Sequence, residues 1–279
     1  MRYLGAGGLF VGWRGHAILT GPFFSNPGFL EIAFGRNRPD EEAIRRGLEG
    51  LPLDRVGALL FGHSHHDHLA DALAVARLAG NARLYLNRTG ARALTAELPR
   101  RLTVLEDTHG RPVQLVDAAG EPLPFRLRAV RSGHAPHVGP ITFMDGEGGC
   151  CDAAFEERRY WSFKEGQSYA LILELTDGDD LASPVRYRLL YQDAASREPV
   201  LHLPPADGGY DLVVTCMASA HRADGYPEDV LALTGARHVL ITHYESFFVE
   251  WGPGHRFVPL LTDGRADAFL DRVGCGLEA

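Results

Sequence analysis

Four histidines and one aspartate occur within six residues of this sequence, in the segment His63-Ser64-His65-His66-Asp67-His68. The whole chain has only 13 histidines among 279 residues, so composition alone does not explain this density. Two imidazoles two residues apart, followed by a carboxylate and a further imidazole, are the donors that zinc and other borderline transition metals prefer. The segment therefore predicts a metal site. The alternative is a His-rich surface loop that picks up metal without function.

The histidine segment directly follows an apolar run, residues 58–61, that ends at Gly62. Such a run predicts a short buried strand. Ligands of open α/β sheets usually bind beyond the carboxyl ends of strands, which is where the segment begins. His63 and His65 can point to the same side if the loop stays extended. The last two residues of the segment are expected in the first turn of a following helix.

Three further strand-like runs also lead directly to residues that bind metals. These are residues 125–130, followed by His134 and His137; residues 188–192, followed by Asp193; and residues 238–242, followed by His243. A single histidine after a strand is usually structural, but four strands that each deliver such residues form a consistent set. The set predicts a metal centre built from distant parts of the chain.

Strand and helix patterns alternate at both ends of the chain, and strand patterns dominate between residues 111 and 193. The expected strands are 7–13, 16–20, 58–61, 83–86, 102–105, 112–116, 125–130, 141–144, 169–175, 187–191, 211–216 and 238–242, and the expected helices are 40–51, 67–79, 90–98, 227–233 and 266–273. This order predicts two sheets with helices outside them. Residues 145–167 are long for a connection and predict either a lid over the site or a disordered insert in a single domain of residues 1–279.

Composition excludes some classes of function. The net charge of −8 argues against a general nucleic-acid-binding protein. A small-molecule substrate, even an anionic one, stays compatible because metal ions would supply positive charge. No apolar stretch is long enough for a transmembrane segment. The four cysteines show no metal-binding spacing, and free thiols indicate the cytoplasm, with a removed leader as the alternative. The sequence does not indicate an oligomeric state.

With these residues in view, the sequence resembles the metallo-β-lactamase superfamily. The histidine segment matches the HxHxDH motif in full, and the later His, Asp and His follow in the family's order, so the resemblance covers nearly the whole chain. It implies an α/β fold, namely a four-layer αβ/βα sandwich with two mixed sheets and helices outside. It also implies two divalent metal ions at one edge. Zinc is the expected ion, and manganese and iron are alternatives that accept the same ligands.

The resemblance implies a role for each matching residue. One ion would be held by His63, His65 and His134, the other by Asp67, His68 and His243, and Asp193 would bridge the two. His137 is the alternative third ligand of the first ion, or else a substrate contact. His221, which follows the strand at 211–216, is a second candidate for a substrate contact.

The expected chemistry follows from these ligands. Two divalent ions about 3.5 to 4 Å apart lower the pKa of a shared water and neutralise charge on the attacking and leaving oxygens. Asp67 would also act catalytically by orienting the resulting hydroxide. Many relatives have an acidic residue where this chain has Gly21. Because that residue supports the ligands without binding the metal, its absence affects the tuning of the site and not metal binding itself.

Asp193 also narrows the function, because true β-lactamases of this superfamily generally lack the bridging aspartate. Residues 191–196 and 242–245 look most like the branch that contains sugar-phosphate lactonases and N-acylphosphatidylethanolamine phospholipase D-like enzymes. We therefore predict a metal-dependent hydrolase that uses a metal-bridging hydroxide to cleave a phosphodiester or a related ester. A lactonase is the first alternative, and a non-catalytic ligand-binding protein on the same fold is the second.

Overall fold

A computed structural model describes residues 1–148, 154–204, 208–249, 256–258, 261–262 and 264–278. Within these ranges the strands form two six-stranded sheets. The first sheet contains, in spatial order, β1 (Arg2–Gly5), β2 (Gly8–Trp13), β3 (His16–Thr20), β4 (Val56–Leu60), β5 (Arg83–Leu86) and β6 (Leu102–Val104). Pairing is antiparallel from β1 to β3 and parallel from β3 to β6.

The second sheet repeats this mixed pattern. Its spatial order runs from β7 (Val113–Val116) through β8 (Pro122–Arg131), β9 (Tyr169–Thr176), β10 (Val185–Tyr191) and β11 (Leu212–Cys216) to β12 (His238–Thr242). Pairing is antiparallel from β7 to β10 and parallel from β10 to β12. Both sheets are therefore mixed, as the resemblance implied.

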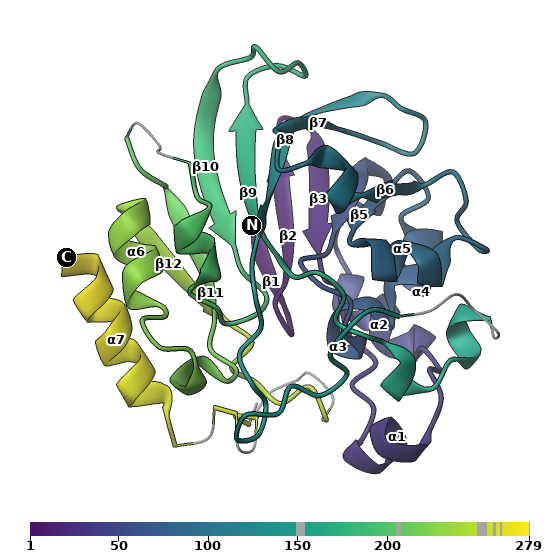
Figure 1. Cartoon of the computed structure of the whole chain (residues 1–279). Helices are drawn as coiled ribbons and strands as arrows, with labels where there is room; N and C mark the ends of the chain where they lie inside the picture. Colours follow the sequence, from purple (N-terminus) through teal and green to yellow (C-terminus); the bar gives the residue numbers. More distant parts are fainter. Residues whose placement is uncertain (149–153, 205–207, 250–255, 259–260, 263, 279) are drawn as a thin grey trace.

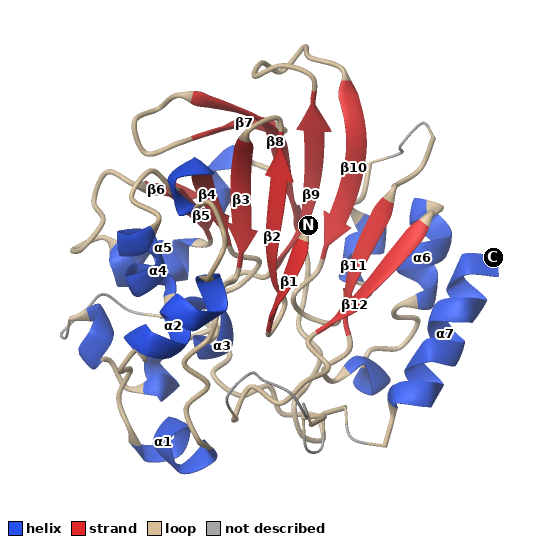
Figure 2. Ribbon diagram, turned by 180° about the vertical axis from the view of Figure 1, so that it is seen from behind, coloured by secondary structure: helices blue, strands red, loops and turns tan. Residues whose placement is uncertain are grey.

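The helices lie outside the two sheets. They are α1 (Phe29–Phe34), α2 (Glu41–Leu48), α3 (His66–Leu69), α4 (Ala72–Leu78), α5 (Arg88–Leu94), α6 (Glu228–Thr234) and α7 (Ala266–Glu278), with 3₁₀ turns η1 (Leu53–Arg55), η2 (Leu105–Thr108), η3 (Phe155–Glu157), η4 (Tyr160–Ser162), η5 (Glu198–Leu201) and η6 (Ala220–Arg222). Figures 1 and 2 show α2, α4 and α5 beside the first sheet, and α6 and α7 beside the second. This arrangement confirms the four-layer αβ/βα sandwich.

Three apolar clusters fill the spaces between these layers. The cluster between the sheets includes Leu60, Phe125 and Leu173, the one outside the first sheet includes Ile44 and Val75, and the one outside the second includes Leu190 and Phe269. Every residue of β4 is buried, as expected for a continuous apolar run covered on both faces. The metal motif thus begins at the end of a rigid, buried strand.

Local signals explain several boundaries. Asp40 caps α2 as predicted, since its carboxylate accepts hydrogen bonds from the N–H groups of Glu42 and Ala43. The single helix expected over residues 67–79 is wrong, because α3 and α4 are separate helices. The break lies at Asp71, whose carboxylate accepts hydrogen bonds from the N–H groups of Phe24 and Ser25 at 2.7 and 2.9 Å. The Asp71 side chain therefore holds the loop after β3, and it does not cap α4.

The strand expected at residues 141–144 is also wrong. Ile141 makes only an isolated bridge with Val138, and its side chain is 55% exposed. This bridge closes a tight local turn, and the segment joins neither sheet in the described part of the chain. Among the described residues no strand lies beside Ile141, so this segment cannot form the hydrogen bonds of a sheet.

The long connection at residues 145–167 is described except for residues 149–153, so Cys150 and Cys151 lie outside the described part. Phe155, Tyr160 and Phe163 from this connection are buried in the cluster outside the first sheet. No helix among the described residues is long and apolar enough to cross a membrane.

Candidate metal centre

Four loops that follow strands meet at one edge of the sandwich, the lower edge in Figures 1 and 2, where α3 lies. The loop after β4 carries the HxHxDH motif, and the loops after β8, β10 and β12 carry His134, Asp193 and His243. His66, Asp67 and His68 form the first turn of α3. The structure therefore brings all seven sequence-predicted metal residues to the same edge.

The first group of donors consists of His63, His65 and His134, which each place one ligand atom within 4.8 Å of the others. Nδ1 of His134 donates a hydrogen bond to the carbonyl oxygen of Ala135 at 2.7 Å. A neutral imidazole protonated at Nδ1 keeps its lone pair on Nε2. The Nε2 atoms of His63 and His65 are buried and have no hydrogen-bond partner among the described residues.

The second group consists of Asp67, His68 and His243. Nε2 of His243 lies 3.0 Å from Oδ2 of Asp67 and 3.2 Å from Nε2 of His68. His243 has a φ of 57°, a left-handed conformation that is uncommon for residues other than glycine and that clusters at functional sites. The backbone at the end of β12 thus turns His243 toward the motif.

Asp193 contacts one histidine of each group. Its Oδ1 lies 3.1 Å from Nδ1 of His63, and its Oδ2 lies 3.8 Å from Nδ1 of His68. Oδ2 also accepts a hydrogen bond from the N–H of Gly62 at 3.0 Å, and any side chain at position 62 would collide with this carboxylate. Burial raises the pKa of Asp193, but His63 and His68 outweigh burial and lower it to about 2. Asp193 is therefore an anion shared by the two groups.

The hydrogen bonds distinguish His134 from His137. The two rings are stacked with centroids 4.7 Å apart, but Nδ1 of His137 accepts a hydrogen bond from the N–H of Phe143 at 3.1 Å. Burial lowers the pKa of His137 to about 4, so the ring is neutral near pH 7 and carries its proton on Nε2. No lone pair of His137 is then left for a metal ion, and this supports His134 as the ligand.

His221 belongs to neither donor group. It lines a pocket with Arg265 and Arg272, and neither of its ring nitrogens has a hydrogen-bond partner within the described ranges. Its neighbour Arg222, however, donates a hydrogen bond to the carbonyl oxygen of His137 at 2.7 Å. The substrate contact predicted for His221 stays a prediction.

A pair formed by the part-buried Tyr3 and the buried Glu245, which the sequence reasoning missed, holds the His243 loop. The hydroxyl of Tyr3 donates to the Glu245 carboxylate, at 2.6 and 2.8 Å to its two oxygens, and accepts from the N–H of His243 at 3.0 Å. The same carboxylate accepts from the N–H of Ala6. The only signal in the sequence was a carboxylate two residues after a candidate ligand.

Asn87 is a second supporting residue that was missed. Its side-chain oxygen accepts from the hydroxyl of Ser64 at 2.5 Å and from the N–H of Gly90 at 2.8 Å, which caps α5. Its side-chain nitrogen donates to the carbonyl oxygen of Glu165 at 2.7 Å. Asn87 directly follows the expected strand at 83–86, so its position as an N-cap was readable, but its contact with the histidine motif was not.

The geometry shows what the glycine at position 21 changes. A Cβ atom built on Gly21 would lie 3.1 Å from Nδ1 of His68. An acidic side chain there would therefore contact this nitrogen, which has no hydrogen-bond partner among the described residues. In this chain the nearby carboxylate is that of Asp193, at 3.8 Å from the same nitrogen.

The residues present fit a divalent metal. A buried polar atom without a partner costs about 1–3 kcal/mol, and this edge gathers several such imidazole nitrogens: His63 Nε2, His65 Nε2, His68 Nδ1 and His243 Nδ1. Coordination would satisfy the Nε2 atoms of His63 and His65, and in the second group it would occupy the close Nε2 pair of His68 and His243, which leaves the Nδ1 atoms of these two rings without a partner. Five imidazoles and two carboxylates form a donor set that suits zinc and related ions.

Aromatic rings extend toward the surface from His243 and from His137, whose ring stacks on that of His134. From His243, ring contacts lead through Phe247 and Phe248 to Phe29, whose side chain is 69% exposed. A second series runs from His137 through Phe143 to Trp161, and consists of the ring contacts His137–Phe143 and Phe143–Trp161. Apolar rings therefore adjoin the metal edge.

Comparisons with known proteins agree with this architecture. No protein-family model and no curated protein matches the sequence. Among solved structures, a metallo hydrolase from the hyperthermophilic archaeon Ignicoccus hospitalis superposes with a TM-score of 0.57 and 14% identity over 99% of this chain and 90% of that chain. A possible metal-dependent hydrolase from Veillonella parvula gives a TM-score of 0.50 and 12% identity over 98% and 92%. The chain has the metallo-β-lactamase fold.

Proposed function

We propose that this chain, with its metallo-β-lactamase fold, is a hydrolase that holds two divalent ions and cleaves a phosphodiester or a related ester. The observation that carries the proposal is the position of Asp193, whose carboxylate contacts His63 of one donor group and faces His68 of the other. A single mononuclear site would not require two complete three-residue groups on either side of a shared carboxylate.

The ions would be held by His63, His65 and His134 on one side and by Asp67, His68 and His243 on the other, with Asp193 between them. Zinc is the ion that we propose, because imidazole nitrogen is the dominant donor. Two such ions, when bound, lower the pKa of water enough to supply a nucleophile near neutral pH and neutralise charge on a leaving oxygen.

Asp67 would orient the attacking water. Burial raises the pKa of Asp67, but the neighbouring His68 and His243 outweigh it and hold the pKa well below its usual range. An ionised carboxylate can only accept hydrogen bonds, so Asp67 would accept one from the water and hold it in line with the substrate.

His137 would bind the substrate. Because its Nδ1 accepts from the N–H of Phe143, its Nε2 carries a proton that can be donated to a substrate oxygen. The hydrogen bond from Arg222 to the carbonyl oxygen of His137 fixes the loop that carries this donor. The rings of Phe143 and Phe247, which adjoin His137 and His243, favour a substrate with an organic group larger than methyl.

The proposal is tested by metal content and turnover together. We expect close to two zinc ions per chain by inductively coupled plasma mass spectrometry and hydrolysis of bis-p-nitrophenyl phosphate by the zinc-loaded protein. Asp193→Ala should lose at least one ion and most of the turnover. Asp179→Ala, which changes an exposed aspartate, should keep two ions per chain and the wild-type turnover.

One ion or none in the wild-type protein would overturn the dinuclear proposal. Two ions with turnover of lactones in preference to the phosphodiester would identify a lactonase instead. Two ions without turnover on panels of esters, lactones and phosphodiesters would favour a ligand-binding protein.

A further inference from the structure

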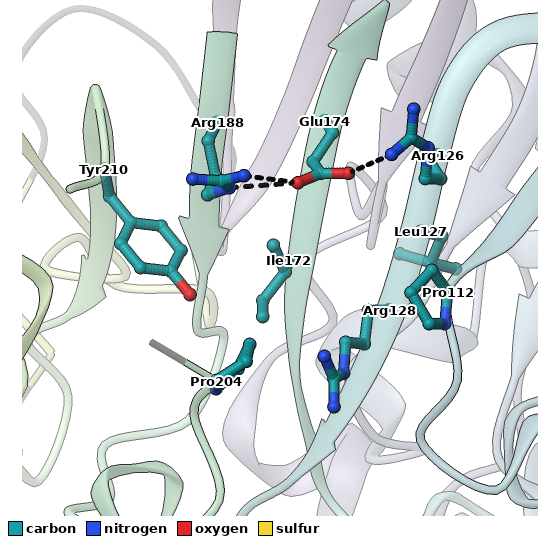
Figure 3. Close-up of a pocket in the computed structure, with 9 residues that line it drawn as sticks. All are labelled: Pro112, Arg126, Leu127, Arg128, Ile172, Glu174, Arg188, Pro204 and Tyr210. Atoms are coloured by element: carbon teal, nitrogen blue, oxygen red, sulfur yellow. Dashed lines mark hydrogen bonds and ion pairs between the residues drawn. The ribbon is translucent and has the colours of Figure 1, made fainter. Parts of the chain in front are cut away.

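A pocket of about 140 Å³ lies on the outer face of the second sheet, away from the metal residues. Figure 3 shows the side chains that line it, namely Pro112, Arg126, Leu127, Arg128, Ile172, Glu174, Arg188, Pro204 and Tyr210. Figure 2 shows α6 and α7 beside β11 and β12, the far strands of this sheet from β8. The pocket therefore lies over β8, β9 and β10, beside the layer that α6 and α7 form.

Strand register places the charged residues of this pocket in one row. Glu174 on β9 is paired with Arg126 on β8 and with Arg188 on β10. Arg128 is paired with Ile172, two residues further along the same strands. Since side chains two residues apart lie on the same face of a strand, Arg126 and Arg128 share the outer face.

The charges in the pocket do not balance. The Glu174 carboxylate accepts a hydrogen bond from Nε of Arg188 at 2.9 Å, and it forms ion pairs with NH2 of Arg188 at 2.9 Å and with NH1 of Arg126 at 3.2 Å. Three guanidinium groups and one carboxylate leave two positive charges in excess among the lining residues, in a chain of net charge −8. Arg128 makes no ion pair with any described residue, so the excess includes a guanidinium without an anionic partner.

Two further polar groups of the pocket lack partners. The hydroxyl of Tyr210 and the Nε of Arg126 are buried and have no hydrogen-bond partner within the described ranges. Figure 3 shows the Tyr210 hydroxyl and the Arg128 guanidinium directed from opposite sides toward the space beside Pro204. Buried donors without acceptors are costly, and an oxyanion between them would accept from both.

We infer that this pocket binds a small organic anion through an oxyanion group, a carboxylate or a phosphoryl group. Arg128 and Tyr210 donate to its oxygens, and the Glu174-paired guanidinium groups supply further positive charge. Pro112, Pro204 and Ile172 provide apolar surface for the rest of the ligand. This inference does not depend on the metal centre.

The strands that form the pocket also lead to residues of the metal centre. β8 and β10, which carry Arg128 and Arg188, are the strands whose ends lead to His134 and Asp193. An anion in the pocket would connect these strands across β9 and stabilise the folded state by mass action.

The inference is tested by isothermal titration calorimetry of the metal-loaded protein with two probes. Sulfate presents an oxyanion alone, and benzoate presents a carboxylate attached to an aromatic ring. Arg128→Gln should weaken binding about ten- to hundred-fold, the usual effect of losing a charge-assisted hydrogen bond. Tyr210→Phe should weaken it several-fold. Arg55→Gln, which removes an exposed arginine in η1 before β4, should bind like wild type.

Tyr210→Phe also controls for misfolding. The hydroxyl has no partner among the described residues, so its removal should leave the thermal unfolding midpoint in the absence of anion unchanged or higher. Wild-type protein that binds neither anion, or an Arg128→Gln variant that binds both as tightly as Arg55→Gln does, would overturn the inference. Equal weakening by Arg128→Gln and Arg55→Gln would indicate attraction by net charge alone and would overturn it too.

Discussion

The Nε2 atoms of His68 and His243 lie 3.2 Å apart, although 175 positions separate the two residues in the chain. Oδ2 of Asp67 lies 3.0 Å from the same atom of His243. A divalent cation among these two imidazoles and the carboxylate would bind all three donors at once. The close approach of these donors leads to the first prediction.

Metal removal should destabilise the protein. A ligand present at about 1,000 times its Kd stabilises the folded state by about 4 kcal/mol, so incubation with a chelator should lower the unfolding midpoint by several degrees. Zinc should restore it. The measurement is differential scanning calorimetry of loaded, chelated and reloaded protein. His243→Ala should respond less to the chelator, and an identical midpoint for loaded and chelated wild type would refute the prediction.

The two histidines after β8 should differ in their effect on metal content. His134→Ala should reduce the zinc content by about one ion per chain, because Nε2 of His134 is the free lone pair of this loop. His137→Ala should keep both ions and raise KM, because the Nε2–H of His137 faces the substrate in our proposal. Metal analysis with steady-state kinetics of both variants decides this. Loss of an ion in His137→Ala alone would reverse the assignment.

Tyr3→Phe should lower the free energy of unfolding by about 1–3 kcal/mol, since it leaves the buried Glu245 carboxylate without its hydroxyl donor. Urea denaturation measures this change. Tyr187→Phe is a matched control, because Tyr187 is 49% exposed and should change the stability by less than about 0.5 kcal/mol. Equal effects of the two substitutions would show that the Tyr3–Glu245 pair contributes nothing specific.

Asp71 should make stability depend on pH. Burial raises its pKa to about 6, although hydrogen bonds from Ser25 and Phe24 oppose this. A carboxyl with a raised pKa in the folded state stabilises the fold fully below its unfolded pKa of about 4, and this stabilisation is lost as pH rises through about 6. A rise of about two units in the pKa corresponds to a change of about 3 kcal/mol in the free energy of unfolding.

Asp71→Asn cannot titrate, so the comparison isolates this group. The free energy of unfolding of wild type minus that of Asp71→Asn should fall between pH 4 and pH 7, as measured by urea denaturation at each pH. A difference that stays constant or rises over this range would contradict a raised pKa for Asp71.

Much of the fold could be predicted because its signals are local. The apolar run before His63, the cap at Asp40 and the alternation of strands and helices depend on residues a few positions apart. The same local signals misled where a distant contact decided the outcome. Asp71 divides the expected helix because it binds the loop at Phe24 and Ser25, 46 or 47 positions earlier.

The sequence by itself determined the kinds of donor in the metal centre and the strand ends that deliver them, since the spacing from His63 to His68 is local. Only the tertiary structure decided which nitrogen of each ring is free, as the Ala135 and Phe143 contacts of His134 and His137 show. It also decided that Tyr3 supports His243 and that Arg128 and Tyr210 share a pocket. Hydrogen bonds and pocket walls join side chains from distant elements, and the packing of the two sheets decides which of those side chains meet.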